Sequence, residues 1–320
     1  MKVNVLVTGI GTIIGYGIIN SLRKSKYDVH IVGMDMNPEA VGKYWCDEFV
    51  VALPAASDEY IPFLKKTIDD YEIDIVLLGI EQDMNKINSC RNELGIYINK
   101  IVINTSSVID LMNDKWSTYG FLKENNFAYI DSTLENDYDK LREYFGGKFL
   151  VKPRKSYSSR GVKVIEDKLT FDFYKQMLGE QLMAQRIVGD NEHEYTTAAF
   201  GYGDGNCSKP IILKRKLSFE GSTLTAEVVD CKPIEDSIIA LSKLLKPVGP
   251  TNFQYRVENN VAYLLEINPR ISSSTSIRTA FGFNEAELSI EYYIEKVIED
   301  NPSIRKGKAI RYISDYIEVL

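Results

Sequence analysis

Oxygen-bearing side chains occur at alternating positions in two apolar runs of the C-terminal third. Gln254 lies in the first run, and Glu266 and Asn268 lie in the second. Because alternate side chains of a strand share a face, pairing the two runs as a hairpin would bring these oxygens together. Carboxylate and amide oxygens are hard ligands that suit a magnesium ion held between protein and phosphate groups. Just beyond them, Arg270 could bind a phosphoryl group or a carboxylate.

The register of this hairpin depends on its turn. A three-residue turn at 258–260 sets Gln254 opposite Leu264 and places Glu266 diagonally on the same face. A two-residue turn would shift the register by one residue and scatter the set. The alternative without function is an ordinary surface ion pair between Glu266 and Arg270.

A basic strand and the loop after it form a second constellation. Lys152 lies near the end of the run Phe149–Pro153, and a serine-rich loop at 156–161 follows. An ammonium group there can reach phosphate oxygens, while small loop residues fold over them and donate backbone N–H groups. We expect an exposed lysine in a mobile hairpin. A solvated basic hairpin without function is the alternative.

Two further segments allow more than one interpretation. The glycine-rich turn Thr8–Gly15, followed by Asp35, suggests a dinucleotide site, but its spacing is GxGxxxG. A tight turn between strand and helix is therefore favoured, and a substrate carboxylate at this turn stays open. The basic run at 214–216 fits either an acidic substrate or an exposed edge strand.

The elements that must position these residues follow from hydrophobic periodicity. In the first hundred residues, short apolar runs alternate with amphipathic stretches, which predicts a parallel sheet wrapped by helices. The predicted strands there are Val3–Thr8, Ile31–Asp35, Phe49–Leu53, Ile75–Gly79 and Ile101–Asn104, and the predicted helices are Asp58–Asp70, Glu81–Glu93 and Ser106–Asn126. Later strands are predicted at Val162–Ile165, Leu182–Gly189, Glu194–Gly201, Pro210–Leu217, Leu224–Val229, Asn252–Val257, Val261–Asn268 and Ile310–Glu318, with a helix at Ile234–Leu245.

Composition sets the broad class. A chain of 320 residues exceeds one hydrophobic core, so two or three packed lobes are expected. A net charge of -7 argues against a general nucleic-acid surface. No apolar stretch is long enough to span a membrane, and the N-terminus does not resemble a secretion signal, so a cytoplasmic protein is expected. Four scattered cysteines and two histidines predict neither a zinc site nor a disulfide framework.

Taken in chain order, the motifs resemble the ATP-grasp superfamily. The motifs that carry this resemblance are Lys115, Lys152, the loop at 156–161, Gln185–Gly189, Glu194, Gln254 and Glu266–Arg270. One synthetase half of the carbamoyl-phosphate synthetase large subunit is especially similar. There a Gly-Pro-x-Asn-x-Gln strand precedes a Glu-x-Asn-Pro-Arg strand, as Gly249–Gln254 and Glu266–Arg270 do here.

The resemblance implies an α/β fold with a pre-ATP-grasp parallel-sheet domain at 1–105 and a two-lobed α+β ATP-grasp domain. Its small lobe with a linking helix would cover 106–187, and its C-terminal lobe, which carries the metal site, would cover 188–320. The implied roles follow position by position. Lys115 and Lys152 contact ATP phosphates; Ser158, Ser159 and Gly161 cover them; Gln185, Ile187 and Glu194 face the nucleoside; Gln254, Glu266 and Asn268 hold Mg²⁺, or Mn²⁺ in its place; and Arg270 steadies an acyl phosphate.

The activity implied is that of an ATP-dependent carboxylate–amine ligase. Its partners would be a small carboxylate and an amine or another nucleophile, with no nucleic acid and no membrane, and a homodimer is compatible with this class. One rival is a nicotinamide-dependent oxidoreductase that uses the N-terminal glycines. A second rival is an ATP-binding regulator without catalysis.

Overall fold

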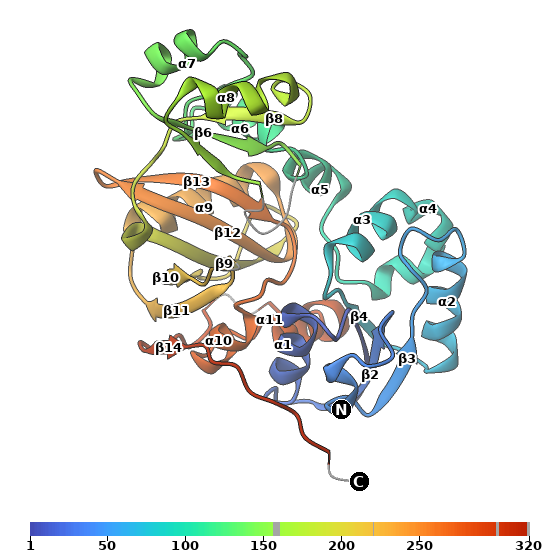
Figure 1. Cartoon of the computed structure of the whole chain (residues 1–320). Coiled ribbons are helices and arrows are strands. Elements are labelled where there is room, and N and C mark those ends of the chain that lie inside the picture. Colours follow the sequence, from blue (N-terminus) through green and yellow to red (C-terminus); the bar gives the residue numbers. More distant parts are fainter. Residues whose placement is uncertain (156–160, 220, 299–300, 319–320) are drawn as a thin grey trace.

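The computed structural model describes residues 1–155, 161–219, 221–298 and 301–318. Its described strands form three sheets of four, six and four strands. Each sheet lies within one of the three segments expected from the sequence. The small lobe stands above the large central sheet, and the N-terminal domain lies beside and below that sheet (Figure 1).

The N-terminal domain is a parallel sheet with strand order β3-β2-β1-β4. Its strands are β1 (Lys2–Thr8), β2 (Asp28–Asp35), β3 (Glu48–Val51) and β4 (Ile75–Leu77), and its helices are α1 (Ile13–Leu22), α2 (Tyr60–Asp70), α3 (Glu81–Ser89) and α4 (Arg91–Leu94). Valine, isoleucine and leucine side chains of β1 and β4 are buried on both faces, which is the pattern of a parallel sheet covered by helices. The expected fifth strand at Ile101–Asn104 is reduced to one bridge between Ile101 and Val76.

Two predicted helices are broken. The helix expected at Glu81–Glu93 ends at Ser89, and α4 begins after Cys90. The helix expected at Ser106–Asn126 divides into α5 (Ser106–Met112) and α6 (Lys115–Glu124). Asp114 causes the second break because it adopts an extended backbone and its carboxylate accepts a hydrogen bond from the Trp116 amide, 2.8 Å away. Lys115 therefore stands at the first position of α6.

The small lobe is a sheet with strand order β5-β8-β6-β7 and two described α-helices on it. Its elements are β5 (Ser132–Thr133), α7 (Tyr138–Phe145), β6 (Phe149–Pro153), β7 (Lys163–Ile165), α8 (Lys168–Tyr174) and β8 (Leu182–Gln185). Phe149 and Val151 face a core that α7 and α8 complete with Leu141 and Phe171. Lys152 follows Val151 and, because successive side chains of a strand alternate, points to the opposite face, toward the crevice shared with the large lobe.

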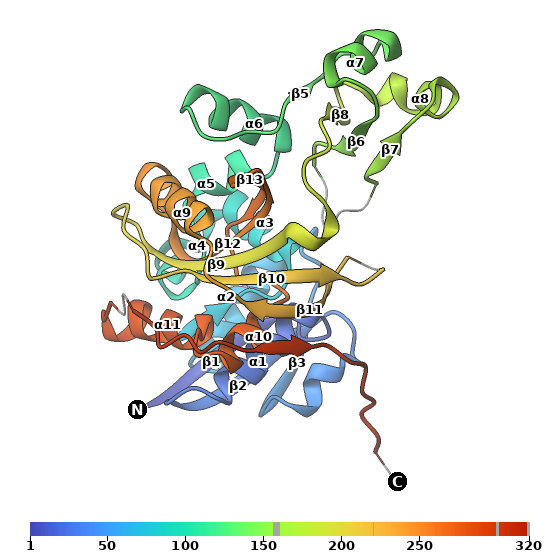
Figure 2. The ribbon, with the colours of Figure 1, turned by 90° about the vertical axis from the view of Figure 1, so that its left-hand side faces the viewer.

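The large lobe is an antiparallel sheet with strand order β13-β12-β9-β10-β11, extended by β14. Figure 2 shows several of these long strands stacked edge to edge. The elements are β9 (Glu194–Tyr202), β10 (Ile211–Leu217), β11 (Thr223–Val228), α9 (Lys232–Leu245), β12 (Val248–Glu258), β13 (Val261–Asn268) and β14 (Lys308–Ile310). The β-like run expected at Ile310–Glu318 is wrong, since only its first residue belongs to a described strand. The basic run at 214–216 lies on an interior strand, so the exposed-edge interpretation is also wrong.

The hairpin of β12 and β13 corrects the predicted register. Its turn has two residues, Asn259 and Asn260, both with positive φ (51° and 62°). Leu264 consequently lies opposite Tyr255 in the core rather than opposite Gln254. A β-bulge next to Tyr255 then inserts one extra residue into β13.

The bulge keeps the polar side chains of β12 and β13 on one face, whereas a two-residue turn without a bulge would place them on different faces. Beyond it, Gln254 lies directly opposite Glu266, and Asn252 lies opposite Asn268. All four positions have polar side chains, which therefore face one another in two cross-strand pairs.

The chain then returns to the N-terminal domain. Helices α10 (Thr275–Ala280) and α11 (Glu285–Ile290) pack against α1, and Ala286 and Ile290 belong to the apolar core beneath the parallel sheet. Thr279 and Asn284 hydrogen-bond to Ser21 at 2.8 and 2.9 Å. These contacts hold the large lobe against the N-terminal domain.

Candidate active site

A crevice of about 340 Å³ lies between the small and large lobes. Lys115, Lys152, Gln185 and Ile187 line it from the small-lobe side, and Glu194, Gln254 and Glu266 line it from the large lobe. Apolar side chains, among them Ile130, Leu150, Val164 and Leu217, complete the walls. The fold thus brings together seven residues that are widely separated in the sequence.

Lys152 is buried rather than exposed, with 8% of its surface accessible. It pairs with Met183 across β6 and β8, so it belongs to a strand and not to the loop of a hairpin. Its pKa is lowered from 10.5 to about 7, mainly by burial and also by the positive charge of Lys115, while Glu266 acts in the opposite direction. A phosphate group placed beside it would restore the charged form.

The start of α6 fixes the backbone of Lys115. Its amide donates to the Arg154 carbonyl at 2.9 Å, while the Arg154 guanidinium binds the Asp114 carboxylate at 2.5 and 3.2 Å. This pair joins the end of β6 to the N-terminus of α6. Lys115 and Lys152 therefore reach the crevice from two elements that are tied together.

Glu194 lies at the centre of a charged network on the floor of the crevice. The strand register places it between Arg215 and Arg256, one on each side. Arg215 donates to one of its carboxylate oxygens at 3.0 Å, and Arg256 donates to the other at 3.0 and 3.2 Å. Arg215 also donates to the Gln254 side-chain oxygen at 2.8 Å. Both Glu194 and Arg215 are buried, so their charges compensate each other.

Glu266 has no ion pair among the described residues, including Arg270. Its carboxylate accepts a 3.1 Å hydrogen bond from the Asn268 side chain, which also approaches the Asn252 oxygen at 3.4 Å. A partly buried carboxylate with amide oxygens close by suits a magnesium ion that is completed by phosphate oxygens and water. Glu266 and Asn268 fit this role, whereas the Gln254 oxygen already accepts from Arg215.

A larger cavity of about 920 Å³ adjoins the crevice and shares Gln254 and Glu266 with it. Asn268, Arg215 and Arg270 line it from the large lobe, and the first residues of α1 line it from the N-terminal domain. Arg270 binds Glu81 of the N-terminal domain at 2.9 Å rather than Glu266, so the alternative of a surface ion pair between Glu266 and Arg270 is wrong. Its buried Nε atom has no partner among the described residues.

Of the other predicted contacts, Gln185 lines the crevice, and Gly161 precedes Val162, which also lines it. Gln185 is buried, and its amide donates to the Ser132 hydroxyl at 2.9 Å. Gly161 has a φ of 81°, and a Cβ there would approach the Pro153 ring at 2.9 Å, so glycine is required by space and by conformation. Ser158 and Ser159 lie outside the described residues.

The glycine-rich turn is tight, and its two ends are in close contact. Gly9 has a φ of 60°, and a Cβ at Gly15 would meet the Gly9 carbonyl oxygen at 2.1 Å. Asp35 accepts a hydrogen bond from the Gly11 amide at 2.8 Å. That amide is therefore occupied in the place where a dinucleotide would need it. The geometry favours the tight-turn interpretation.

Arg215 is the central side chain whose role sequence reasoning missed. The basic run at 214–216 is visible in the sequence, but an edge strand and an interior strand can both carry such a run. The sequence therefore does not show that Arg215 is buried. Arg256 and Asn252 were likewise unassigned. The nearest signal was the position of Asn252 within the Gly-Pro-x-Asn-x-Gln strand.

Two family models match this chain. Residues 191–316 match the family described as "ATP-grasp in the biosynthetic pathway with Ter operon". The chain carries an ATP-grasp domain. Residues 5–99 match the family described as "PylC-like, N-terminal domain", so the domain before the ATP-grasp lobes also has known relatives. The resemblance read from the sequence is confirmed.

Known proteins similar to the chain agree with this assignment. The carbamoyl phosphate synthase large chain of Methanocorpusculum labreanum is 25% identical over 92% of this chain, which spans only 30% of that relative. The N5-carboxyaminoimidazole synthetase of Staphylococcus aureus, solved with ADP, has a TM-score of 0.73 at 15% identity, covering 95% of this chain and 79% of that chain. The biotin carboxylase of Campylobacter jejuni has a TM-score of 0.74 at 16% identity, covering 95% and 74%. These likenesses confirm the predicted fold class.

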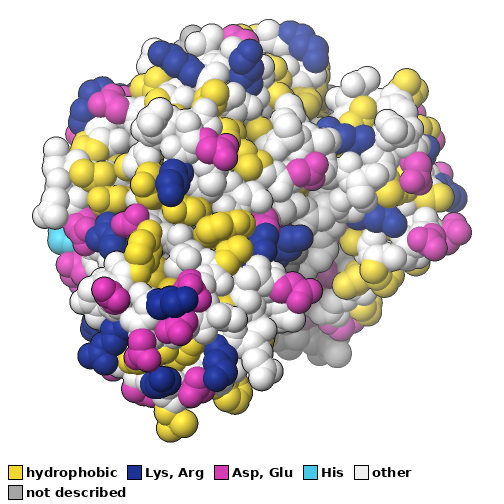
Figure 3. Space-filling model, turned by 90° about the horizontal axis from the view of Figure 1, so that it is seen from above, with side chains coloured by type: hydrophobic (Ala, Val, Ile, Leu, Met, Phe, Trp, Pro, Cys, Tyr) yellow, Lys and Arg dark blue, Asp and Glu magenta, His cyan; other side chains and the backbone are white. Residues whose placement is uncertain are grey.

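The surface gives two further observations. Basic and acidic side chains intermingle over the upper face of the molecule (Figure 3). None of the described helices combines the length and the apolar composition needed to cross a membrane.

Proposed function

We propose that this chain is an ATP- and magnesium-dependent ligase that joins a carboxylate to an amine, or to another nucleophile, through an acyl phosphate. One observation carries the proposal. Lys115 and Lys152 of the small lobe converge with Glu266 of the large lobe in one crevice, which opens into a second cavity lined by Arg270. Two lysines beside a carboxylate that has no ion pair among the described residues form a site for a polyphosphate and its metal ion.

Each of the two cavities binds a different substrate. The nucleotide occupies the crevice, with its base among the apolar side chains near Ile187 and its phosphates toward Lys152 and Glu266. The carboxylate substrate occupies the larger cavity, where Arg215 and Arg270 line the wall together with the N-terminal end of α1. The shared residues Gln254 and Glu266 mark the place where the two substrates meet.

The reaction runs in two steps. An oxygen of the carboxylate attacks the γ-phosphorus of ATP, the bond to the β-phosphate oxygen breaks, and ADP and an acyl phosphate form. The amine then attacks the acyl carbon, the bond to the phosphate oxygen breaks, and the amine proton leaves as the amide forms. Magnesium, when bound at Glu266 and Asn268, supplies charge neutralisation on the phosphates.

The side chains of this chain supply position and charge. Lys115 and Lys152 reduce the repulsion between the anionic acid and the polyphosphate. Arg270 is placed to hold the acyl phosphate. Glu194 holds Arg215 in place and neutralises it. No side-chain nucleophile is needed, and the histidines and cysteines line neither cavity.

The test is an ADP-release screen of carboxylic acids paired with amines, run on the wild type and on Glu266→Gln. We expect a pair that releases ADP in proportion to amide formed. Glu266→Gln keeps the shape of the side chain but loses the charge, so turnover should fall at least about 10²-fold and the magnesium requirement should rise. Equal magnesium titrations and equal maximal rates in the two proteins would remove Glu266 from the mechanism.

The same screen separates the rival functions. ATP binding without turnover on any acid would favour a regulator without catalysis. Binding of NAD, with no binding of ATP, would favour an oxidoreductase. The cytoplasmic location and the homodimer stay predictions.

A further inference from the structure

A third cavity, of about 380 Å³, lies in the N-terminal domain at the carboxyl ends of its parallel strands. Of the residues that the structure describes, none lines both this cavity and the crevice or the larger cavity. Most of its wall is apolar and includes Met34, Met36, Leu53 and Ile80. Crevices outside the carboxyl ends of parallel strands are common ligand sites in open α/β sheets.

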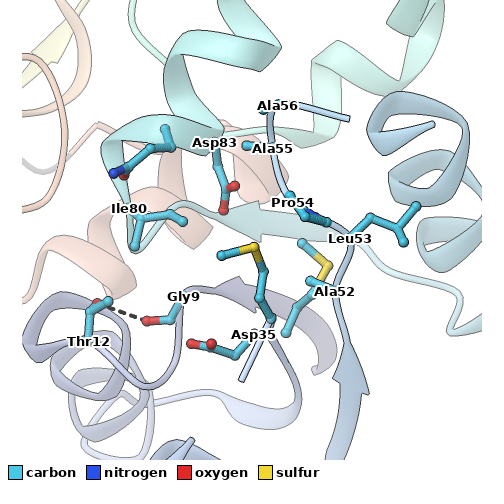
Figure 4. Close-up of a pocket in the computed structure, with 13 residues that line it drawn as sticks. Gly9, Thr12, Asp35, Ala52, Leu53, Pro54, Ala55, Ala56, Ile80 and Asp83 are labelled. Carbon is cyan, nitrogen blue, oxygen red and sulfur yellow. Dashed lines mark hydrogen bonds between the residues drawn. The ribbon is translucent and has the colours of Figure 1, made fainter. Parts of the chain in front are cut away.

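A buried carboxylate points into this cavity. Figure 4 shows Asp83 directed toward the space between Ile80 and the strand that carries Asp35. Asp83 lies in the first turn of α3 and is only 4% exposed. Burial raises its pKa, and the charge of Asp35 raises it further, while the hydroxyls of Thr8 and Tyr60 act in the opposite direction. Among the described residues, no cationic side chain forms an ion pair with it.

The second carboxylate, Asp35, stands at the edge of the same cavity. Its two oxygens accept hydrogen bonds from the Gly11 and Asn37 amides at 2.8 and 2.9 Å. It too has no ion pair within the described part of the chain. Among the described residues, the cavity therefore presents two carboxylates and no basic lining side chain.

This charge pattern excludes anionic ligands. A nucleotide at the carboxyl end of such a sheet would need free amides in the glycine-rich turn for its phosphates. Here the Gly11 amide is bound to Asp35, and the Thr12 amide is bound to the Gly9 carbonyl at 3.0 Å. A phosphate would also face two carboxylates beside a largely apolar wall. A cationic ligand instead supplies the countercharge that Asp83 lacks.

We propose that this cavity binds a small ligand with an apolar body and a protonated amine. The ammonium group donates to Asp83, with Asp35 adding negative potential, and the body packs against Met34, Met36 and Ile80. This site is separate from the nucleotide crevice and does not rest on the proposed ligase activity. It would hold if the chain had no ligase activity.

Calorimetric titration of the full chain without nucleotide tests the site. Phenethylamine is the probe, and 3-phenylpropionate, which is similar in size and opposite in charge, is the comparison. We expect saturable binding of one amine per chain and no binding of the acid. Asp83→Asn keeps the side-chain shape and should weaken amine binding at least about tenfold. Asp58→Asn, outside the cavity, is the matched control and should bind as the wild type does.

A second variant guards against a folding defect in Asp83→Asn. Ala56 is exposed at the rim of the cavity, and Ala56→Trp should fill the cavity and abolish binding while leaving the melting temperature close to that of the wild type. Amine binding that neither variant weakens would place the amine elsewhere, such as the larger cavity, and overturn the proposal. Absence of saturable amine binding, equal binding of the acid, or NAD binding that Asp35→Ala abolishes would also overturn it.

Discussion

Nucleotide binding should draw a proton onto Lys152. In the free protein its pKa is about 7, because burial and the nearby charge of Lys115 disfavour the ammonium form. At pH 8 only about 0.1 of the molecules carry the proton, whereas at pH 6 about 0.9 do. Phosphates beside the ammonium return the pKa toward its ordinary value of 10.5. The side chain should therefore take up about 0.9 proton at pH 8 and about 0.1 proton at pH 6.

Calorimetric titration with ADP, in two buffers with different ionisation enthalpies, measures this uptake. The nucleotide and other groups also exchange protons, so the decisive quantity is the difference between the wild type and Lys152→Met. Lys163→Met, which removes an exposed lysine from the neighbouring strand, is the control and should take up as many protons as the wild type. Equal uptake at pH 8 in wild type and Lys152→Met would refute the assignment of Lys152 to the phosphates.

The stability of the free protein gives a second readout of the same group. The unfolded lysine has a pKa near 10.5, so between about pH 7 and 10.5 the folded state holds fewer protons than the unfolded state. Stability should rise with pH across that window, and the cost of the buried charge is fully present below about pH 7. That cost is at most about 5 kcal/mol, and Lys152→Met should remove part of it and raise the melting temperature without nucleotide. An unchanged pH dependence of melting in Lys152→Met would contradict the burial argument.

Two further variants, one deletion and one substitution, test the large lobe. Deleting Leu265, the residue after the pair Tyr255 and Leu264, removes the extra residue of the bulge and leaves Glu266 opposite Gln254 in a regular ladder. ADP release should therefore persist, and the far-ultraviolet circular dichroism should stay close to that of wild type. Loss of turnover in a folded deletion variant would contradict the argument that the pairing of Gln254 with Glu266 sets the site. Glu194→Gln leaves Arg215 buried without its countercharge and should cost about 3–5 kcal/mol in a denaturant titration, and a loss below about 1 kcal/mol would contradict the network.

The sequence alone determined the order of the motifs and most of the strands. Side-chain chemistry and chain order are both written in the sequence, so Lys115, Lys152, Gln254 and Glu266 are predictable as one set. The parallel sheet was also predictable, since strands buried on both faces are continuous runs of valine, isoleucine and leucine. Local patterns of this kind can be recognised in the sequence without knowledge of distant contacts.

Tertiary structure determined the strand register that brings the motifs together. The turn at Asn259 and Asn260 is one residue shorter than predicted, and only the bulge brings Gln254 and Glu266 opposite each other. A bulge leaves little trace in hydrophobic alternation because it adds one residue to one strand. The register was therefore set by cross-strand packing, with Leu264 in the core.

Burial was the second property that the sequence did not determine. Lys152 and Arg215 are charged residues, and a sequence places them by default at the surface. In the fold, Lys152 is buried in the crevice between the small and large lobes, and the neighbouring strands β9 and β11 enclose Arg215 beside Glu194. Whether a charge is buried depends on which strands become its neighbours, and those neighbours come from distant parts of the chain. The sequence thus specified the chemical groups of the site, and the fold set their solvation and their partners.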